Sequence, residues 1–149
     1  MVDDLYQKNL LRHAAASIGH GRLLKPHGTV TLDNPLCGDR VTIDVKLKNR
    51  LISEVAQVVR ACVLCQAAAS IIGSNAVDKS ESDIQSIVAA TKDMLHSTET
   101  LSGKIWPEME AFAPVATHSS RHRCVLLPFE ALLQAIKSAT AGEDDSVTT

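Results

Sequence analysis

Neither sign of charge dominates this sequence. Among its 149 residues, 15 are lysine or arginine and 17 are aspartate or glutamate, which gives a net charge of −2. Proteins that bind nucleic acid through their surface charge carry a basic excess, often clustered on one face. The sequence therefore gives no reason to expect a nucleic-acid partner.

Long apolar runs are also missing from the sequence. We find no run near the ~20 residues that a membrane-spanning helix needs, and the N-terminal Met1 to Asp4 lack the basic and apolar regions of a signal peptide. We therefore expect a cytoplasmic protein with no membrane partner. In that reducing compartment, four cysteines favour a metal site or reactive thiols over structural disulfides.

Internal repeats and a second hydrophobic unit are absent from the pattern. A chain of 149 residues suits one domain with a real core. We expect that domain to span residues 1–140. Residues 141–149, which include Gly-Glu-Asp-Asp, are expected to form an acidic disordered tail.

The first half of the chain predicts one helix followed by a β region. Residues from Asp3 to about His20 show the spacing of an amphipathic helix, with Ile18 in its apolar stripe. From 41 to 48, apolar residues alternate with polar ones such as Asp44, which is typical of a strand with one wet face. Because Asn49 suits a hairpin turn, we expect a three-stranded antiparallel meander with helices covering one face.

The second half predicts two helices before the last one. The first begins near Cys62 and is broken between Gly73 and Ser80. The second begins after Ser80, where Asp83 completes an acidic form of the capping box. Its expected apolar face comprises Ile84, Ile87, Val88, Thr91, Met94 and Leu95.

A long C-terminal helix is predicted from about Arg121 to Ala139, after a connector that contains a short helical piece. Pro128 falls in the first turns of this helix. Since proline is best tolerated at the start of a helix, the regular part is expected to begin there and to leave Cys124 just before it.

The cysteines carry the strongest chemical signal. Cys62 and Cys65 form a C-x-x-C pair, whereas Cys37 and Cys124 stand alone, and this pattern argues against a zinc ribbon with two close pairs. A thiol enzyme built on Cys62 and Cys65 is an alternative. It is disfavoured because a thioredoxin-like site needs a βαβ setting, and this chain reads as a meander followed by helices.

Three motifs give a resemblance to a known family. Asn34-Pro-Leu-Cys-Gly-Asp39 before an alternating strand resembles the N-P-x-C-G-D signature of iron–sulfur cluster assembly scaffolds, the NifU N-terminal, IscU and SufU family. Cys62 before an Ala/Ser-rich helix and Cys124 near the start of the last helix match that family's second and third cysteines. The 61 residues between Cys62 and Cys124, and Arg123 in place of the IscU histidine, are most similar to the SufU branch.

The resemblance implies an α+β fold of the SufE/NifU type, with a three-stranded antiparallel sheet, helices on one face, an N-terminal helix and a long C-terminal helix. It implies a non-enzymatic scaffold that receives sulfur from a cysteine desulfurase, assembles a transient 2Fe-2S cluster and passes it to apo iron–sulfur proteins. The implied ligands are Cys37, Asp39, Cys62 and Cys124, with Cys124 or Cys37 as sulfur acceptor. We expect a monomer or weak dimer.

Several alternatives stay open at this point. Zinc can occupy the same ligands, so the chain is alternatively a zinc-binding sulfur acceptor that activates a cysteine desulfurase and builds no cluster. Cys65 is an additional thiol relative to the family pattern, and core packing is favoured over a ligand role. His122 is expected to be solvated, and His13 to be a partly buried helix residue rather than a ligand.

Overall fold

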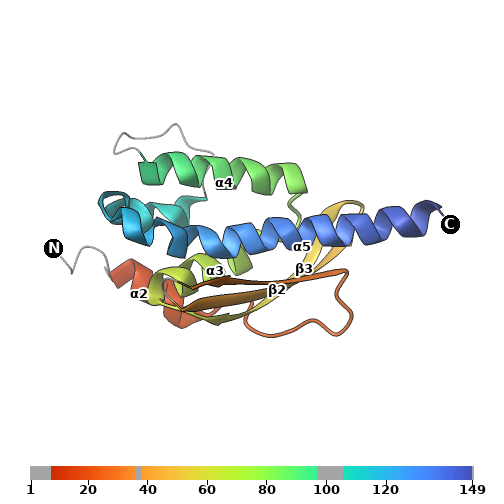
Figure 1. The fold of residues 1–149 in the computed structure, drawn as a ribbon, viewed down its shortest axis with the longest axis horizontal. Helices are drawn as coiled ribbons and strands as arrows, with labels where there is room; N and C mark the ends of the chain where they lie inside the picture. The colour runs from red at the N-terminus through yellow and green to blue at the C-terminus, as the bar shows by residue number, and fades with distance from the viewer. Residues whose placement is uncertain (1–7, 36–37, 97–105, 149) are drawn as a thin grey trace.

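The computed structural model describes residues 8–35, 38–96 and 106–148, and for 142–148 it describes the backbone alone (Figure 1). Helices and strands follow one another as an α+β chain, which confirms the predicted fold class. In chain order they are α2 (Lys8–Ala16), β1 (Gly28–Asn34), β2 (Asp39–Lys48), β3 (Leu51–Arg60), α3 (Val63–Asn75), α4 (Glu81–His96), the 3-10 helices η1 (Pro107–Thr117) and η2 (Ser119–Arg121), and α5 (His122–Thr148).

The three strands form one antiparallel sheet in the order β1-β2-β3, which confirms the predicted meander. Asn49 and Arg50 join β2 to β3 with φ angles of 55° and 65°. Two consecutive residues at positive φ give a tight turn whose twist matches that of the strands it joins. The turn pairs Lys48 with Leu51, and a β-bulge between Lys46 and Leu47 then shifts the register by one residue, so that Arg40 lies opposite Arg60 at the far end of the hairpin.

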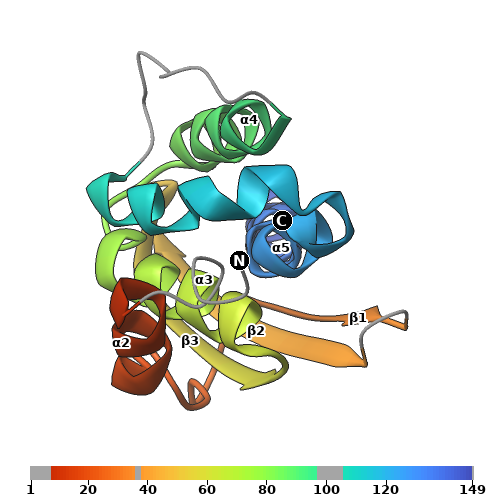
Figure 2. The same ribbon diagram turned by 90° about the vertical axis from the view of Figure 1, so that its left-hand side faces the viewer.

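Helices cover one face of the sheet in two layers (Figure 2). The strands lie at the bottom of that view, α5 and α3 lie directly on them, and α4 lies on the far side of α5. The covered face of β2 presents Val41, Ile43 and Val45, all fully buried. Burying one apolar face of an antiparallel sheet under helices supplies the hydrophobic core that the alternation predicted.

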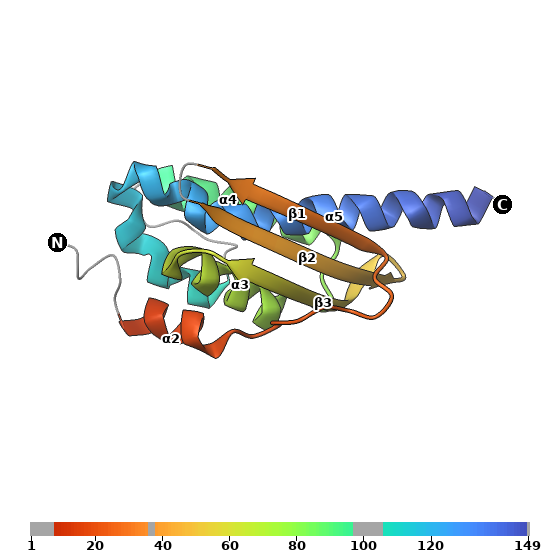
Figure 3. The same ribbon diagram turned by 60° about the horizontal axis from the view of Figure 1, so that its bottom comes forward.

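The other face of the sheet contains a buried charged residue, Asp44, at a position that was predicted to be exposed to solvent. Asp44 is fully buried because the segment that leads from α2 to β1 crosses this face (Figure 3). Its carboxylate accepts hydrogen bonds from Arg22 Nε at 2.6 Å and Nη2 at 3.1 Å, from the Leu23 N–H at 3.1 Å and from Thr29 Oγ1 at 2.7 Å. Burial works to raise the pKa of Asp44, but these hydrogen bonds and the charge of Arg22 outweigh it and hold that pKa below its usual value.

The first described helix, α2, ends earlier than predicted. It stops at Ala16 because Ser17 adopts a φ of 46° and turns the chain. Ile18, expected in the apolar stripe, therefore leaves the helix and is 44% exposed. Residues 3–7 of the predicted helix lie outside the described part of the chain.

The helices α3 and α4 follow the prediction with one shift. α3 continues through Gly73 to Asn75, because Gly73 serves a close approach and not a helix break: a Cβ there would overlap the carbonyl of Ile18. At the start of α4, the Ser80 N–H donates to Asp83 Oδ2 at 3.0 Å and the Asp83 N–H donates to Ser80 Oγ at 3.1 Å. This confirms the capping box, and all six residues of the predicted apolar face are buried.

The long helix α5 begins at His122, close to the predicted start near Arg121. The expectation that the regular helix begins at Pro128 is wrong, and Cys124 lies in the first turn. The 3-10 turns η1 and η2 lead directly into α5, so the helix is already formed upstream of Pro128, which is tolerated inside it. A helix that has been nucleated extends at little cost, and α5 also continues to Thr148, through the residues expected to form a disordered tail.

By length and composition alone, one helix within the described residues is long and apolar enough to cross a membrane. It spans 119–141, with a mean hydropathy of 1.2, and 61% of that apolar window is buried inside the molecule. The same stretch supplies the centre of the core, including Phe129, Leu132 and Ile136. The apolar character of the stretch is thus explained by the packing of α5 on β1, β2 and α3.

Candidate metal centre

Three of the predicted ligands come together at one end of the sheet. Asp39 is the first residue of β2, Cys62 lies immediately before α3, and Cys124 lies in the first turn of α5. One ligand atom from each, a carboxylate oxygen and two sulfurs, all lie within 4.8 Å of one another. The register explains part of this, since Arg40 pairs with Arg60 and so places the ends of the hairpin, with Asp39 and Cys62, side by side.

The carboxylate of Asp39 holds Cys62 through two contacts. Asp39 Oδ1 accepts a hydrogen bond from the Cys62 N–H at 3.1 Å, and the Cys62 thiol points at Asp39 Oδ2 over 3.9 Å. The N–H groups at a helix start lack partners within the helix, so Asp39 also stabilises the entry into α3 from outside it. Asp39 is 2% exposed, Cys124 is fully buried and Cys62 is half-buried.

The donor set fits a metal that prefers thiolate with one harder oxygen ligand. Around a tetrahedral zinc, a sulfur and an oxygen ligand stand roughly 3.6 Å apart, given the usual Zn–S and Zn–O bond lengths. The 3.9 Å between Cys62 Sγ and Asp39 Oδ2 needs only a small closure to reach that spacing. All three described donors lie within 4.8 Å of one another, and this pair is close to the spacing that a tetrahedral metal requires.

The fourth predicted ligand, Cys37, lies outside the described residues. On either side of it, Asn34 and Asp39 pair across β1 and β2, and the Gly38 N–H donates to the Asn34 carbonyl at 2.8 Å. Gly38 has a φ of 73°, a conformation that glycine adopts without strain.

A family model for the NifU-like N-terminal domain matches residues 5–138, which is most of the chain and includes all four predicted ligands. The chain belongs to the NifU-like N-terminal domain family. This confirms the resemblance drawn from the three cysteine motifs.

Individual relatives of this NifU-like chain carry two kinds of name. An iron–sulfur cluster assembly scaffold protein IscU of Streptococcus pyogenes is 28% identical over 136 residues, covering 91% of this chain and 85% of the relative. A zinc-dependent sulfurtransferase SufU of Bacillus subtilis is 24% identical over 144 residues, covering 95% of each.

Solved structures agree on the fold. The crystal structure of a NifU-like N-terminal protein of Brucella abortus superposes with a TM-score of 0.87 at 28% identity, covering 94% of this chain and 97% of that one. A SufU scaffold structure of Fervidobacterium islandicum has a TM-score of 0.83 at 19% identity, covering 91% and 99% of the two chains.

Two further residues near the NifU-like site were predicted from the sequence. Cys65 is fully buried in the core, as a packing role would require. His122 was expected to be solvated, and that is wrong: it is 8% exposed, and its Nε2 lies 3.1 Å from the Ala116 carbonyl. The 3-10 turns that precede α5 enclose this ring, which also meets His96 edge-on at 5.2 Å between centroids. His13 is half-buried, as expected.

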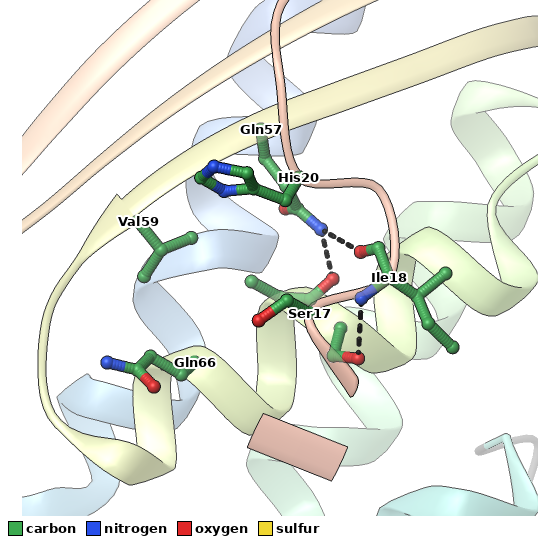
Figure 4. A pocket seen from close by; sticks show the side chains of 8 residues that line it. Ser17, Ile18, His20, Gln57, Val59 and Gln66 are labelled. Carbon is green, nitrogen blue, oxygen red and sulfur yellow. Dashed lines mark hydrogen bonds between the residues drawn. The ribbon is translucent and has the colours of Figure 1, made fainter. Parts of the chain in front are cut away.

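A second hollow in this NifU-like domain was not foreseen. It opens between β3, α3 and the turn after α2 (Figure 4) and shares no residue with the Asp39 cluster. Gln57, 2% exposed, donates from Nε2 to the carbonyls of Ile18 and Ala69, and its Oε1 has no partner among the described residues. In the sequence, Gln57 is distinguished only by its place in an apolar strand. The residues that line the hollow are Ser17, Ile18, His20, Gln57, Val59, Gln66, Ala69 and Ser70.

Proposed function

We propose that this protein is an iron–sulfur cluster assembly scaffold, which accepts sulfur from a cysteine desulfurase and transfers the assembled cluster to apo iron–sulfur proteins. The observation that carries the proposal is the group formed by the buried Asp39 and Cys124 and the half-buried Cys62, with its ligand atoms within 4.8 Å of one another. Family membership and the IscU name of relatives in Streptococcus pyogenes and Thermotoga maritima support it.

The proposed ligand set is Cys37, Asp39, Cys62 and Cys124, and the cluster is a transient 2Fe-2S cargo. Thiolates are the usual ligands of iron–sulfur clusters, and a carboxylate is a harder, poorer match for iron that is bound to sulfide. The Asp39 edge is therefore the weakest edge of the shell. A scaffold needs such an edge because it must release what it builds.

Each residue of the site has a separate task in this proposal. Asp39 positions Cys62 through its N–H and supplies the labile oxygen, while Cys124 and Cys37 are the candidates that accept sulfur. The scaffold itself turns over no substrate, so we class it as a non-enzyme that works in the cytoplasm with the desulfurase and the apo-proteins as partners.

A zinc-dependent sulfur acceptor is the second candidate function. The Bacillus subtilis relative is named a zinc-dependent sulfurtransferase and aligns over 95% of both chains. The three described donors equally suit zinc, which is tetrahedral with thiolate and carboxylate ligands in many proteins. In this alternative, the metal organises the site, and sulfur passes on without a cluster being built.

Reconstitution under anaerobic conditions separates the two candidates. The purified chain is incubated with ferrous iron, cysteine and a cysteine desulfurase, and iron, acid-labile sulfide and visible absorption are measured, with Cys62→Ala as the control. Iron and sulfide in equal amounts, lost in the control, support the scaffold. One tightly held zinc that iron does not displace, with no visible absorption, supports the sulfur acceptor. Binding of neither iron nor zinc would contradict both candidate functions.

A further inference from the structure

Cys62 and Cys65 occupy two related positions at the start of α3. Cys62 is the residue before the first helical turn, with φ −67° and ψ 169°, and Cys65 is the third residue of the helix. Side chains at these two positions are neighbours, as the reciprocal contacts of a capping box show. Residues three apart in a helix have Cα atoms about 5 Å apart, which lies within the roughly 4.4–6.8 Å that a disulfide spans.

The surroundings of the two thiols differ. Cys62 is half-buried and belongs to the group with Asp39 and Cys124, whereas Cys65 is fully buried in the core and is not in that group. All three described cysteines are thiols in this structure. Among the described cysteines, Cys62 is therefore the one that belongs both to the candidate ligand group and to the C-x-x-C pair.

We propose that Cys65 is a resolving thiol that converts sulfur delivered to the site into sulfide. The inference rests on the proposed function, since it needs a persulfide sulfur to arrive from a desulfurase. That sulfur reaches Cys62 directly or from Cys124, whose Sγ lies within 4.8 Å of the Cys62 sulfur.

The reaction balances within the protein. The Cys65 thiolate attacks the inner sulfur of the Cys62 persulfide, a Cys62–Cys65 disulfide forms, and the outer sulfur leaves as hydrosulfide with the bonding electron pair. The two thiols lose two electrons, and the sulfane sulfur gains them to become sulfide. An external dithiol reductant then reduces the disulfide and restores both thiols.

A disulfide from Cys62 to Cys65 preserves more of the ligand group than one to Cys124. A Cys62–Cys124 disulfide would remove two of the three described ligands at once, whereas a Cys62–Cys65 disulfide leaves Asp39 and Cys124 available. The hydrosulfide is released at Cys62, beside the groups that are to bind iron. Sulfide is thereby made where it is needed, and the return of Cys62 as a ligand depends on the dithiol reductant.

A pulse experiment on the whole chain tests the inference. The metal-free protein is treated briefly with glutathione persulfide under anaerobic conditions and desalted, and peptide masses and released sulfide are followed over time without reductant. The wild type should lose its persulfide and gain a Cys62–Cys65 disulfide, with one sulfide released per disulfide. In Cys65→Ala the persulfide should persist on the order of tenfold longer or more, because the neighbouring thiol is gone.

Zinc binding by the same samples separates the possible failures. Persulfide that forms on the wild type and is lost at the same rate in Cys65→Ala, with zinc bound by both, overturns the inference and leaves the proposed function standing. A wild type that takes up neither persulfide sulfur nor metal overturns both. If Cys65→Ala does not fold, the mapped disulfide in the wild type still decides: a Cys62–Cys124 linkage, or none, contradicts the inference.

Discussion

The Asp39 carboxylate and Cys62 are joined twice, by a hydrogen bond from the Cys62 N–H at 3.1 Å and by the approach of the Cys62 sulfur to within 3.9 Å. The first contact stabilises the fold, and the second belongs to the proposed metal shell. One side chain therefore connects the start of β2 to the start of α3 and places a hard ligand beside a soft one.

Substituting Asp39 separates these two contributions. Asp39→Asn keeps an oxygen that can accept from the Cys62 N–H but removes the charge, so zinc affinity should fall about tenfold or more while the folded state is largely retained. Asp39→Ala removes both contacts and should also lower the free energy of unfolding by about 1–2 kcal/mol. Zinc titration and urea denaturation of the metal-free protein measure the two effects. Equal stability losses in the two variants would contradict the double role.

Cys65 and Cys124 make a matched pair of buried cysteines for the metal site. Cys65→Ala should retain the zinc stoichiometry of the wild type and cost about 1–2 kcal/mol of stability through lost packing. Cys124→Ala should cost a similar amount in the metal-free protein but lose the bound metal. Metal analysis after gel filtration checks this, and the reverse pattern would overturn the ligand assignment.

Asp44 predicts how stability depends on pH. Its pKa is lowered in the folded state, so its contribution is present above the unfolded value of about 3.9 and is lost as pH falls through the folded pKa. Asp44→Asn should therefore be less stable than the wild type near neutral pH, by about 1–3 kcal/mol for a buried, charge-assisted acceptor. The difference should shrink below about pH 4. Urea denaturation at several pH values measures it, with Thr29→Val as a control that removes one of the four hydrogen bonds.

At Gly28, strand β1 packs so closely against α5 that there is no room for a side chain. A Cβ at this position would overlap the backbone carbonyl of Ala135 in α5, and backbone cannot move aside as a flexible side chain can. Gly28→Ala should lower the free energy of unfolding by about 1–3 kcal/mol. Thr31→Ala, at an exposed position of the same strand, should change it far less. Similar losses in both variants would show that α5 adjusts readily.

The elements that followed the prediction are those set by local pattern. The alternation in β2, the positive φ of Asn49 and the capping box of Ser80 and Asp83 each depend on a few neighbouring residues. The convergence of Asp39, Cys62 and Cys124 was expected from motifs. The register of the β2–β3 hairpin explains why Asp39 and Cys62 lie close together, but it does not explain the position of Cys124.

The expectations that were wrong depend on partners far along the chain. From the sequence pattern, Asp44 was predicted to be exposed to solvent. In the structure it is bound by Arg22, which lies 22 residues earlier in a loop that crosses the sheet. His122 is buried by 3-10 turns that leave no clear periodicity in the sequence. Gly73 reads as a helix break, because its contact with Ile18 belongs to another segment. Periodicity describes a segment alone and carries no information on what is laid over it.

The ligand shell of the metal tests the central claim most directly. X-ray absorption at the zinc edge of the zinc-loaded protein reports how many sulfur and oxygen donors surround the ion. We predict a four-coordinate shell of three sulfurs and one oxygen, which Cys65→Ala keeps unchanged, whereas Cys62→Ala, like Cys124→Ala, loses the bound metal. A shell of four sulfurs would indicate that Cys65 is a ligand in place of Asp39. A shell without sulfur would contradict the proposed site altogether.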